Sequence, residues 1–437
     1  MPEFHSSRRV SHIPDDVTLE QFILGYRHEA RPTRPESAPW LVSAETGRQI
    51  RLDEIHRRTT GFANALHTHF GIRENDVVLI FSPNHIEYPI CIWAVHRLCA
   101  IVSACNPTYS SAELTSHLLQ TRATLIIAHS SLRDVARAGA HAAGVPSTRI
   151  IVLDNGDSAG EPGVAAADED PDLGTVAGLT AYGLGLGSAP LGRGRRLREG
   201  EGHTKVAFLS SSSGATRKPK ARPAAAIIAI SHFAVIANVV QIATHCRVNE
   251  AYTSWVERRY RPGDTCLGVL PFYHVWGLTL VIHFVLFSGM TLIVAPTFHL
   301  ESVLKTIVRH KINQLILLPP QVEPVVRDYD LSGVRSILCA AAPLGAETSE
   351  RIMRLLPNAH IGQAYGATET AGIISMWPLR SQRGYNAGEL VPGLVTRVVR
   401  SDGALAEHNE AGELLVRTPS LALGYLGDED TRPGQDA

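Results

Sequence analysis

Hydrophobic and polar positions alternate between helical and strand spacing over the first third of the chain. Residues 53–66 place Ile55, Phe62 and Leu66 on one side of an amphipathic helix. The continuous apolar run 77–81 follows and predicts a buried strand. The alternation continues with helices at 85–97, 111–118 and 132–142 and strands at 100–104, 124–128 and 149–153. Short Val and Ile runs separated by helices predict a mostly parallel sheet that helices cover on both faces.

This pattern stops at the glycine-rich stretch 155–203, which we interpret as a linker. A second α/β series follows, and beyond Gly388 short runs separated by turns predict a small β unit. The apolar runs of the second series lie at 267–271, 290–295, 314–318, 336–340 and 359–362, with helices at 299–309 and 346–356. We therefore expect an α/β protein divided into a first α/β subdomain (1–154), a linker (155–203), a second α/β subdomain (204–380) and a small β unit (381–437).

Composition excludes several classes of protein. The formal net charge of −1 over 437 residues provides no basic face for nucleic acid, so we expect small-molecule partners. The six cysteines lie in apolar runs without a CxxC pair, which predicts buried free thiols in a reducing compartment. We expect no signal peptide and no transmembrane segment, because the longest apolar run, 278–286, is too short to span a bilayer and contains His283. We expect a cytoplasmic protein, or a peroxisomal one if the natural C-terminus extends beyond Ala437; the oligomeric state stays open.

Candidate chemistry is concentrated in the stretch 206–220, VAFLSSSSGATRKPK. An apolar strand breaks there into serines, a glycine and a threonine, and cations follow. Backbone N–H groups, small hydroxyls and ammonium groups can all point at phosphate oxygens, so the stretch indicates a nucleotide-phosphate site. It does not have the Walker pattern, because Pro219 separates the two lysines. A solvated polar loop is the alternative interpretation.

Together with other motifs, this stretch resembles the adenylate-forming superfamily of acyl- and aryl-CoA ligases, luciferases and peptide-synthetase adenylation domains. The matching segments are SSSGATRKPK (211–220), PFYHVWGL (271–278), AAAPLG (340–345), GQAYGATET (362–370) and GELLVRTPSLALGYL (412–426). Their order, together with CNPTYSSAEL at 105–114, is most similar to the 4-coumarate–CoA ligase and fungal acyl-CoA ligase branch. The resemblance implies the fold of the large N-terminal domain of these enzymes, with two α/β subdomains and a small β unit, and without the C-terminal lid domain.

The resemblance also implies roles for individual residues. Glu369 would bind Mg²⁺, a cation that prefers oxygen ligands, and Tyr365 would cover the adenine of ATP. The implied nucleotide-binding residues are Ser212, Ser213, Gly214, Thr216, Lys220, Ala341, Ala342, Gln363, Tyr365 and Thr368; the implied catalytic residues are Thr368, Glu369 and Lys220; the implied acyl-site residues are His274, Trp276, Ala340 and Gly366. Without the resemblance, Thr368 and Glu369 would be interpreted as a helix N-cap with a first-turn acid, and His274 as a satisfied core residue.

The implied reaction joins a carboxylic acid to ATP to form an acyl-adenylate, which then passes its acyl group to coenzyme A. Arg217 and Ala221 stand where the family has glycines, about seven residues are inserted before Ser231, and most of a helix is missing within 320–330. The chain ends before the family's ribose-binding aspartate and its C-terminal lysine domain, so we expect catalysis by this chain alone to be impaired. A non-catalytic nucleotide- or acyl-adenylate-binding protein and a carrier-loading adenylation unit are the alternatives. Hydroxycinnamates, benzoates and medium-chain fatty acids all suit the implied site.

Overall fold

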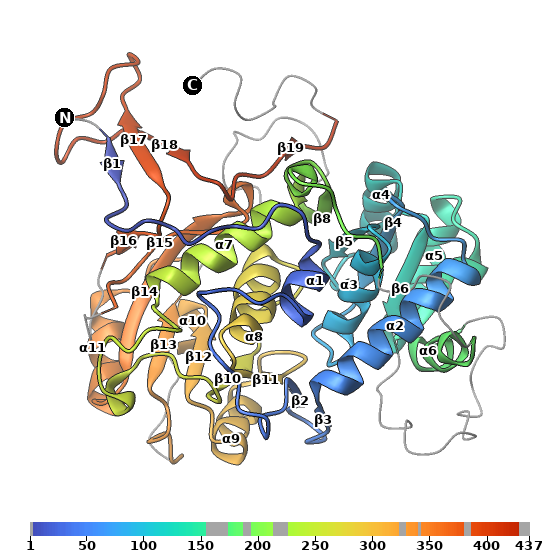
Figure 1. Cartoon of the computed structure of the whole chain (residues 1–437), viewed down its shortest axis with the longest axis horizontal. Coiled ribbons are helices and arrows are strands. Elements are labelled where there is room, and N and C mark those ends of the chain that lie inside the picture. The colour runs from blue at the N-terminus through green and yellow to red at the C-terminus, as the bar shows by residue number, and fades with distance from the viewer. Residues whose placement is uncertain are drawn as a thin grey trace.

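Two large mixed β-sheets and a small third sheet carry the fold (Figure 1). The computed structural model describes residues 3–153, 174–186, 194–212, 226–322, 329–339, 342–379 and 386–427. Ser213, Gly214, Thr216, Lys220, Ala340 and Ala341, which the sequence assigns to the site, lie outside these ranges.

The first sheet has seven strands in the order β19-β9-β8-β5-β4-β6-β7. Their bounds in that order are Gly424–Tyr425, Ile227–Ser231, Val206–Ser211, Ile101–Cys105, Val77–Phe81, Leu125–His129 and Ile150–Leu153. The five strands from β8 to β7 run parallel, whereas β9 is antiparallel to β8 and β19 is antiparallel to β9. Val78 and Ile80 of β4 face one hydrophobic core, and Val77, Leu79 and Phe81 face another. Burial on both faces explains why this strand is apolar throughout.

Helices cover both faces of the seven-stranded sheet (Figure 1). They are α1 (Leu19–Leu24), α2 (Leu52–Thr68), α3 (Tyr88–Arg97), α4 (Ser111–Thr121) and α5 (Arg133–Ala142). The first three pack in the core between the two large sheets, and α4 and α5 cover the outer face. The predicted helices and parallel strands of this region are therefore confirmed.

A further helix, α6 (Val176–Gly185), lies inside the stretch that we interpreted as a linker. It packs on α2, where Asn64 Nδ2 donates to the Gly183 carbonyl over 3.2 Å. A Cβ at Gly183 would lie 1.8 Å from the Gly61 carbonyl oxygen. The glycines at 61 on α2 and 183 on α6 therefore let the two helix backbones pack this closely. Hydrophobic periodicity does not predict α6 because small residues, rather than an apolar stripe, make its contact.

The second sheet has nine strands in the order β16-β15-β14-β13-β12-β10-β11-β2-β3. Their bounds in that order are Glu389–Leu390, Gly372–Met376, His360–Ala367, Ser336–Cys339, Gln314–Leu317, Thr265–Gly268, Thr291–Val294, Leu41–Ser43 and Gln49–Ile50. Its accompanying helices are α7 (His232–His245), the π-helical η5 (Trp276–Phe284), α8 (Val285–Phe287), α9 (Leu300–His310), α10 (Pro319–Val322) and α11 (Ala346–Leu355). Helices α9 and α11 share a core with one face of the sheet, and α7, η5 and α8 fill the space between the two large sheets.

The third sheet has three strands in the order β1-β17-β18. Their bounds in that order are Phe4–His5, Val395–Val399 and Glu413–Arg417. The N-terminal β1 thus pairs with β17, and Glu3 forms an ion pair with Arg397 beside it. Single 3₁₀ turns occupy η1 (Ser130–Leu132), η2 (Ser147–Arg149), η3 (Glu201–His203), η4 (Trp255–Glu257) and η6 (Thr368–Thr370). The predicted fold class, two α/β layers with a small β unit, is confirmed. Strands cross the predicted boundaries, however, because β2 and β3 join the second large sheet and β8 and β9 join the first.

All six cysteines are buried thiols that form no disulfide, as predicted. No helix in the described ranges is long and apolar enough to cross a membrane.

Candidate active site

A tight turn between β14 and β15 presents Thr368 and Glu369, two of the three residues to which the sequence assigned catalysis; the third, Lys220, lies outside the described residues. Thr368 and Glu369 form the single 3₁₀ turn η6 between these antiparallel strands. The residue that caps this turn is Ala367, which makes no side-chain capping bond. The alternative interpretation of Thr368 as an N-cap therefore does not describe the local structure. A Cβ at Gly366 would lie 2.0 Å from the Gly372 carbonyl oxygen, so the two strands meet too closely for a side chain there.

Glu369 is held from two directions by the segment that contains β19. The Tyr425 hydroxyl donates to Glu369 Oε1 over 2.7 Å, and the Ala422 N–H donates to the Glu369 carbonyl, also over 2.7 Å. The carboxylate is half-buried. Tyr425 pairs with Ile228 of β9 through its backbone, so its position is fixed independently of its hydroxyl. These contacts hold the Glu369 carboxylate beside the strand that follows the serine- and lysine-rich stretch.

The start of that stretch lies at the end of β8. Ser212 is half-buried, and its N–H donates to the Ala226 carbonyl over 2.9 Å as the β8–β9 pairing ends. Tyr109 follows the neighbouring strand β5 and forms a side-chain hydrogen bond with Ser211. Burial raises the pKa of the Tyr109 hydroxyl, and this hydrogen bond opposes the rise. The carboxyl ends of parallel strands are the usual place for ligands in open α/β sheets, and Ser211, Ser212 and Tyr109 lie at this edge.

The end of β14 carries one buried amide and one exposed ring. Gln363 is 7% exposed, and its Oε1 accepts from the Leu344 N–H over 2.7 Å, which fixes the 342–345 segment beside the strand. Ala342 is exposed on that segment. Tyr365, two residues beyond Gln363, is 47% exposed. An exposed aromatic ring beside a fixed backbone segment suits a flat ligand such as a nucleobase.

The histidine and tryptophan of the PFYHVWGL segment have different surroundings. His274 is half-buried, and its Nδ1 accepts from the Trp276 N–H over 3.4 Å. Burial lowers the pKa of His274, so its ring is neutral at pH 7. Trp276 is 4% exposed and belongs to the core between the large sheets. The same helix, η5, is bonded to the residue after the 3₁₀ turn, since Thr279 Oγ1 donates to the Ala371 carbonyl over 2.7 Å.

The buried side-chain amide of Asn238 on α7 forms hydrogen bonds with the backbone of the β14–β15 hairpin. Asn238 Nδ2 donates to the Ile373 carbonyl over 2.8 Å, and its Oδ1 accepts from the Ile373 N–H over 2.9 Å. Next to it on the helix, Gln241 Nε2 donates to the Pro392 carbonyl over 2.9 Å and to Thr418 Oγ1 over 3.2 Å. Both amides are fully buried in a mostly apolar helix. They join the hairpin to the segment that leads to Tyr425.

The geometry agrees with a comparison against protein families. Residues 28–426 match the family described as AMP-binding enzyme, which covers most of the chain. This protein belongs to the AMP-binding enzyme family.

Relatives of this AMP-binding enzyme are CoA ligases. The chain is 29% identical to acyl-CoA ligase AFT1-1 of Alternaria alternata over 96% of its own length and 70% of that protein, and 28% identical to 4-coumarate–CoA ligase 3 of Arabidopsis thaliana over 90% and 65%. In fold, it is similar to a long-chain-fatty-acid-CoA ligase from Archaeoglobus fulgidus, with a TM-score of 0.77, 21% identity, and coverage of 97% of this chain and 79% of that one. It is also similar to the anthranilate CoA ligase AuaEII in complex with anthranoyl-AMP, with a TM-score of 0.76, 18% identity, and coverage of 96% and 73%. The predicted resemblance to fungal acyl-CoA ligases and 4-coumarate–CoA ligases is confirmed.

The donor set of the AMP-binding enzyme fits Mg²⁺ bound together with phosphate. Within the described ranges, no group of three or more His, Cys, Asp or Glu side chains gathers into a site for a metal. Mg²⁺ keeps several waters and is held by one or two carboxylates together with substrate phosphates, so a single half-buried carboxylate such as Glu369 is the appropriate ligand.

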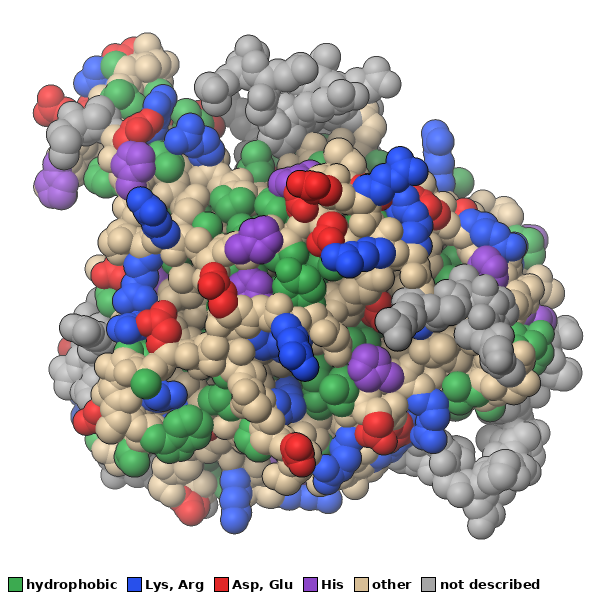
Figure 2. Space-filling model, viewed as in Figure 1, with side chains coloured by type: hydrophobic (Ala, Val, Ile, Leu, Met, Phe, Trp, Pro, Cys, Tyr) green, Lys and Arg blue, Asp and Glu red, His purple; other side chains and the backbone are tan. Residues whose placement is uncertain are grey.

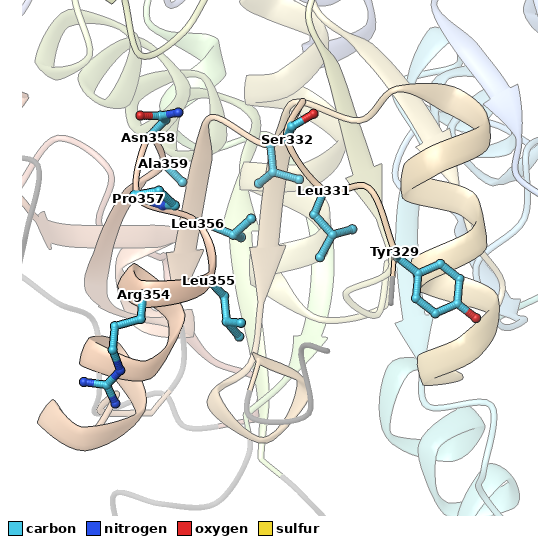
Figure 3. A pocket seen from close by; sticks show the side chains of 10 residues that line it. Tyr329, Leu331, Ser332, Arg354, Leu355, Leu356, Pro357, Asn358 and Ala359 are labelled. Carbon is cyan, nitrogen blue, oxygen red and sulfur yellow. The ribbon is translucent and has the colours of Figure 1, made fainter. Parts of the chain in front are cut away.

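A cavity of about 370 Å³ lies away from these residues and is lined by residues within 329–334 and 354–359 (Figure 3). Leu331 precedes β13, and Leu356 and Ala359 precede β14, so the cavity is at the amino ends of these strands. Tyr365 lies near the carboxyl end of β14, and Glu369 follows that end. The cavity is therefore at the opposite edge of the sheet, and none of the predicted site residues that the structure describes lines it.

Sequence reasoning missed the residues that support the site. Tyr425 and Asn238 contact the hairpin from positions 56 and 135 residues away along the chain. The one available sign for Asn238 was an amide in an apolar helical run, since a buried amide needs a partner. Tyr109 was inside a motif that supported the family resemblance, but no role was assigned to it.

Proposed function

We propose that this chain activates an aryl or acyl carboxylic acid with ATP and transfers the acyl group to coenzyme A. A carboxylate oxygen of the acid attacks the α-phosphorus of ATP, and the bond to the leaving pyrophosphate breaks. The thiol of coenzyme A then loses its proton to solvent, its sulfur attacks the acyl carbon, and AMP leaves with the electrons of the broken acyl C–O bond of the mixed anhydride. The buried thiols of the chain support a reducing compartment such as the cytoplasm.

The observation that carries the proposal is the turn that contains Thr368 and Glu369. It holds a carboxylate and a hydroxyl at the carboxyl end of β14, and Tyr425 fixes the carboxylate beside β9. In the proposed reaction Glu369 holds Mg²⁺ and Thr368 donates to the α-phosphate. Bound Mg²⁺ would neutralise phosphate charge, and positioning with charge stabilisation dominates such transfers.

The remaining assignments follow the matching motifs. Tyr365 covers the adenine, while Gln363 and the 341–342 backbone border it. Ser212, Ser213, Gly214, Thr216 and Lys220 hold the outer phosphates. His274, Trp276, Ala340 and Gly366 border the acid, and neutral His274 suits an uncharged aryl or acyl body.

The test is acid-dependent release of pyrophosphate, followed by detection of the acyl-CoA product. The purified chain is incubated with MgATP, coenzyme A and separate hydroxycinnamate, benzoate and medium-chain fatty acids. Glu369→Gln is compared with Glu413→Gln, which removes the same charge from an exposed position on β18. We expect the first variant to lose activity about a hundredfold or more and the second to keep it. MgATP binding without pyrophosphate release for any acid would instead favour a non-catalytic nucleotide-binding protein.

A further inference from the structure

A second cavity lies in the segment between α1 and β2 and the start of α2, on elements that carry none of the candidate active site. Its volume is about 930 Å³, which is within the usual range for a small-molecule pocket of about 300–1,000 Å³. On the face of the molecule that Figure 2 shows, Lys and Arg side chains are visible near the middle, below the position of α1 in Figure 1. The ionisable lining includes the arginines Arg27, Arg31, Arg34 and Arg51 and the acids Glu36 and Asp53. The lining therefore carries more positive than negative charge.

Two of these arginines are partly buried and lie close together against one indole ring. The guanidinium carbon of Arg34 is 4.6 Å from the ring centroid of Trp40, and that of Arg31 is 5.9 Å from the same centroid. Trp40 itself is 4% exposed. Stacking on the ring fixes the planes of both guanidinium groups before any ligand arrives.

Backbone carbonyl groups are the hydrogen-bond partners of both guanidinium groups. Arg31 donates to the carbonyls of Ile23, Tyr26 and Phe22 over 2.7, 3.1 and 3.3 Å. Arg34 donates to those of Met290, Pro39 and Leu286 over 2.6, 3.0 and 3.3 Å. Each guanidinium has five N–H donors, so these three bonds leave two donors on each arginine for another acceptor.

Neither positive charge is balanced by a carboxylate within the described part of the chain. Arg31 and Arg34 form no ion pair there, although other partly buried arginines, such as Arg58 with Glu87, do. Burial lowers the pKa of Arg31 to about 10, and burial together with repulsion from Arg31 lowers that of Arg34 to about 9. Both groups thus remain charged at pH 7. Two adjacent, partly desolvated cations are costly unless an anion is placed between them.

We propose that this cavity binds a small phosphate-bearing anion between Arg31 and Arg34. A phosphate monoester concentrates nearly two negative charges on one group at pH 7, which matches two neighbouring guanidiniums, whereas a dicarboxylate spreads its charges apart. The fork of each guanidinium fits phosphate oxygens. The apolar lining residues Leu24, Pro32 and Leu52 would contact the body of the ligand. The site is separate from the proposed ATP site and does not depend on the proposed function.

The test is calorimetric titration of the full chain with inorganic phosphate at constant ionic strength, with citrate as a polycarboxylate comparison. Phosphate is titrated into the parent chain, the Lys220→Ala chain and the Arg34→Gln chain. We expect Lys220→Ala to retain the phosphate-binding event of this cavity, whatever it loses at the proposed ATP site, and Arg34→Gln to weaken the cavity event about tenfold or worse, the effect of losing a charged hydrogen bond. Loss in Lys220→Ala with retention in Arg34→Gln would assign the anion to the active site and overturn the proposal. Binding of citrate without binding of phosphate would also overturn it.

A milder pair of variants covers the case in which Arg34→Gln does not fold, since Arg34 also supports the backbone. Arg27 is an exposed lining residue, and Arg57 is exposed on α2 outside the cavity. Both changes to Gln remove one charge. We expect Arg27→Gln to weaken phosphate binding severalfold and Arg57→Gln to leave it unchanged. Equal effects of the two variants would mean that only net charge matters, which would contradict a built site.

Discussion

The hydroxyl of Tyr425 is expected to act as a positioning group for the carboxylate that would bind Mg²⁺. Tyr425→Phe removes one hydrogen bond, from the hydroxyl to Glu369 Oε1 at 2.7 Å, and keeps the ring. The backbone pairing of Tyr425 with Ile228 and the bond from the Ala422 N–H to the Glu369 carbonyl do not involve the hydroxyl. The change should therefore alter the carboxylate without unfolding its surroundings.

The size of the effect follows from the kind of bond and its exposure. A hydrogen bond to a charged group contributes about 1.5–3 kcal/mol, and the lower end applies because the Glu369 carboxylate is only half-buried. A loss of about 1–2 kcal/mol corresponds to about a 5- to 30-fold decrease in affinity. We expect this loss in the Mg²⁺ dependence of nucleotide binding, because the lost bond orients the metal ligand rather than the phosphate-binding segment.

The assay is titration of MgATP at several Mg²⁺ concentrations, with thermal unfolding as the check on folding. The matched control is Tyr182→Phe, which removes a hydroxyl from a 48% exposed tyrosine on α6. We predict that Tyr425→Phe needs more Mg²⁺ to reach half-saturation and that its unfolding temperature matches that of the control. If the Mg²⁺ dependence of Tyr425→Phe is the same as that of Tyr182→Phe, the positioning role is wrong.

Three further changes test the core and the supports of the site. Burial lowers the pKa of His96 to about 3, that of His283 to about 4 and that of His232 well below 6.5, so these rings take up protons on unfolding below pH 6.5. The free energy of unfolding in urea should therefore fall by about 1.4 kcal/mol in total for each histidine between pH 7.5 and 5.5, and a constant value would count against neutral core histidines. Asn238→Ala leaves the Ile373 N–H and carbonyl without their partner and should destabilise the chain by about 2–4 kcal/mol in urea unfolding, whereas an unchanged midpoint would show that the clamp is dispensable. Gly366→Ala places a Cβ 2.0 Å from the Gly372 carbonyl oxygen and should lower the free energy of unfolding by about 1–3 kcal/mol in the same assay. Gly185→Ala places its Cβ in open space and should leave the free energy of unfolding unchanged; equal urea midpoints for the two variants would refute the clash.

The sequence predicted those parts of the fold that have a local signature. The run 77–81 is β4 with the same bounds, because a strand buried on both faces must be apolar at every position. The helix expected at 53–66 is α2, which spans Leu52–Thr68, because its apolar side chains recur at helical spacing. The motif at 362–370 forms the hairpin turn of the candidate site, although its local form is a 3₁₀ turn rather than a capped helix.

What the sequence could not predict depends on contacts between distant segments. Strand β19 has only two residues and joins the first large sheet by pairing with β9, and no local pattern distinguishes such a strand from a loop. The pairing of β2 with β11 likewise brings an N-terminal strand into the second large sheet. Arg31 and Arg34 lie in a proline-rich stretch that is typical of a solvated loop. Only the position of the Trp40 ring beside them shows that their charges are partly buried.

The most direct test of the central claim is exchange of labelled pyrophosphate into ATP, because exchange requires reversible formation of an acyl-adenylate. The chain is incubated with MgATP and labelled pyrophosphate, with and without each candidate acid and without coenzyme A. We predict label in ATP only when a suitable acid is present, and a loss of that exchange in Glu369→Gln. Exchange that is absent with every acid tested, in a chain that binds MgATP, would contradict the proposal that this turn activates a carboxylic acid.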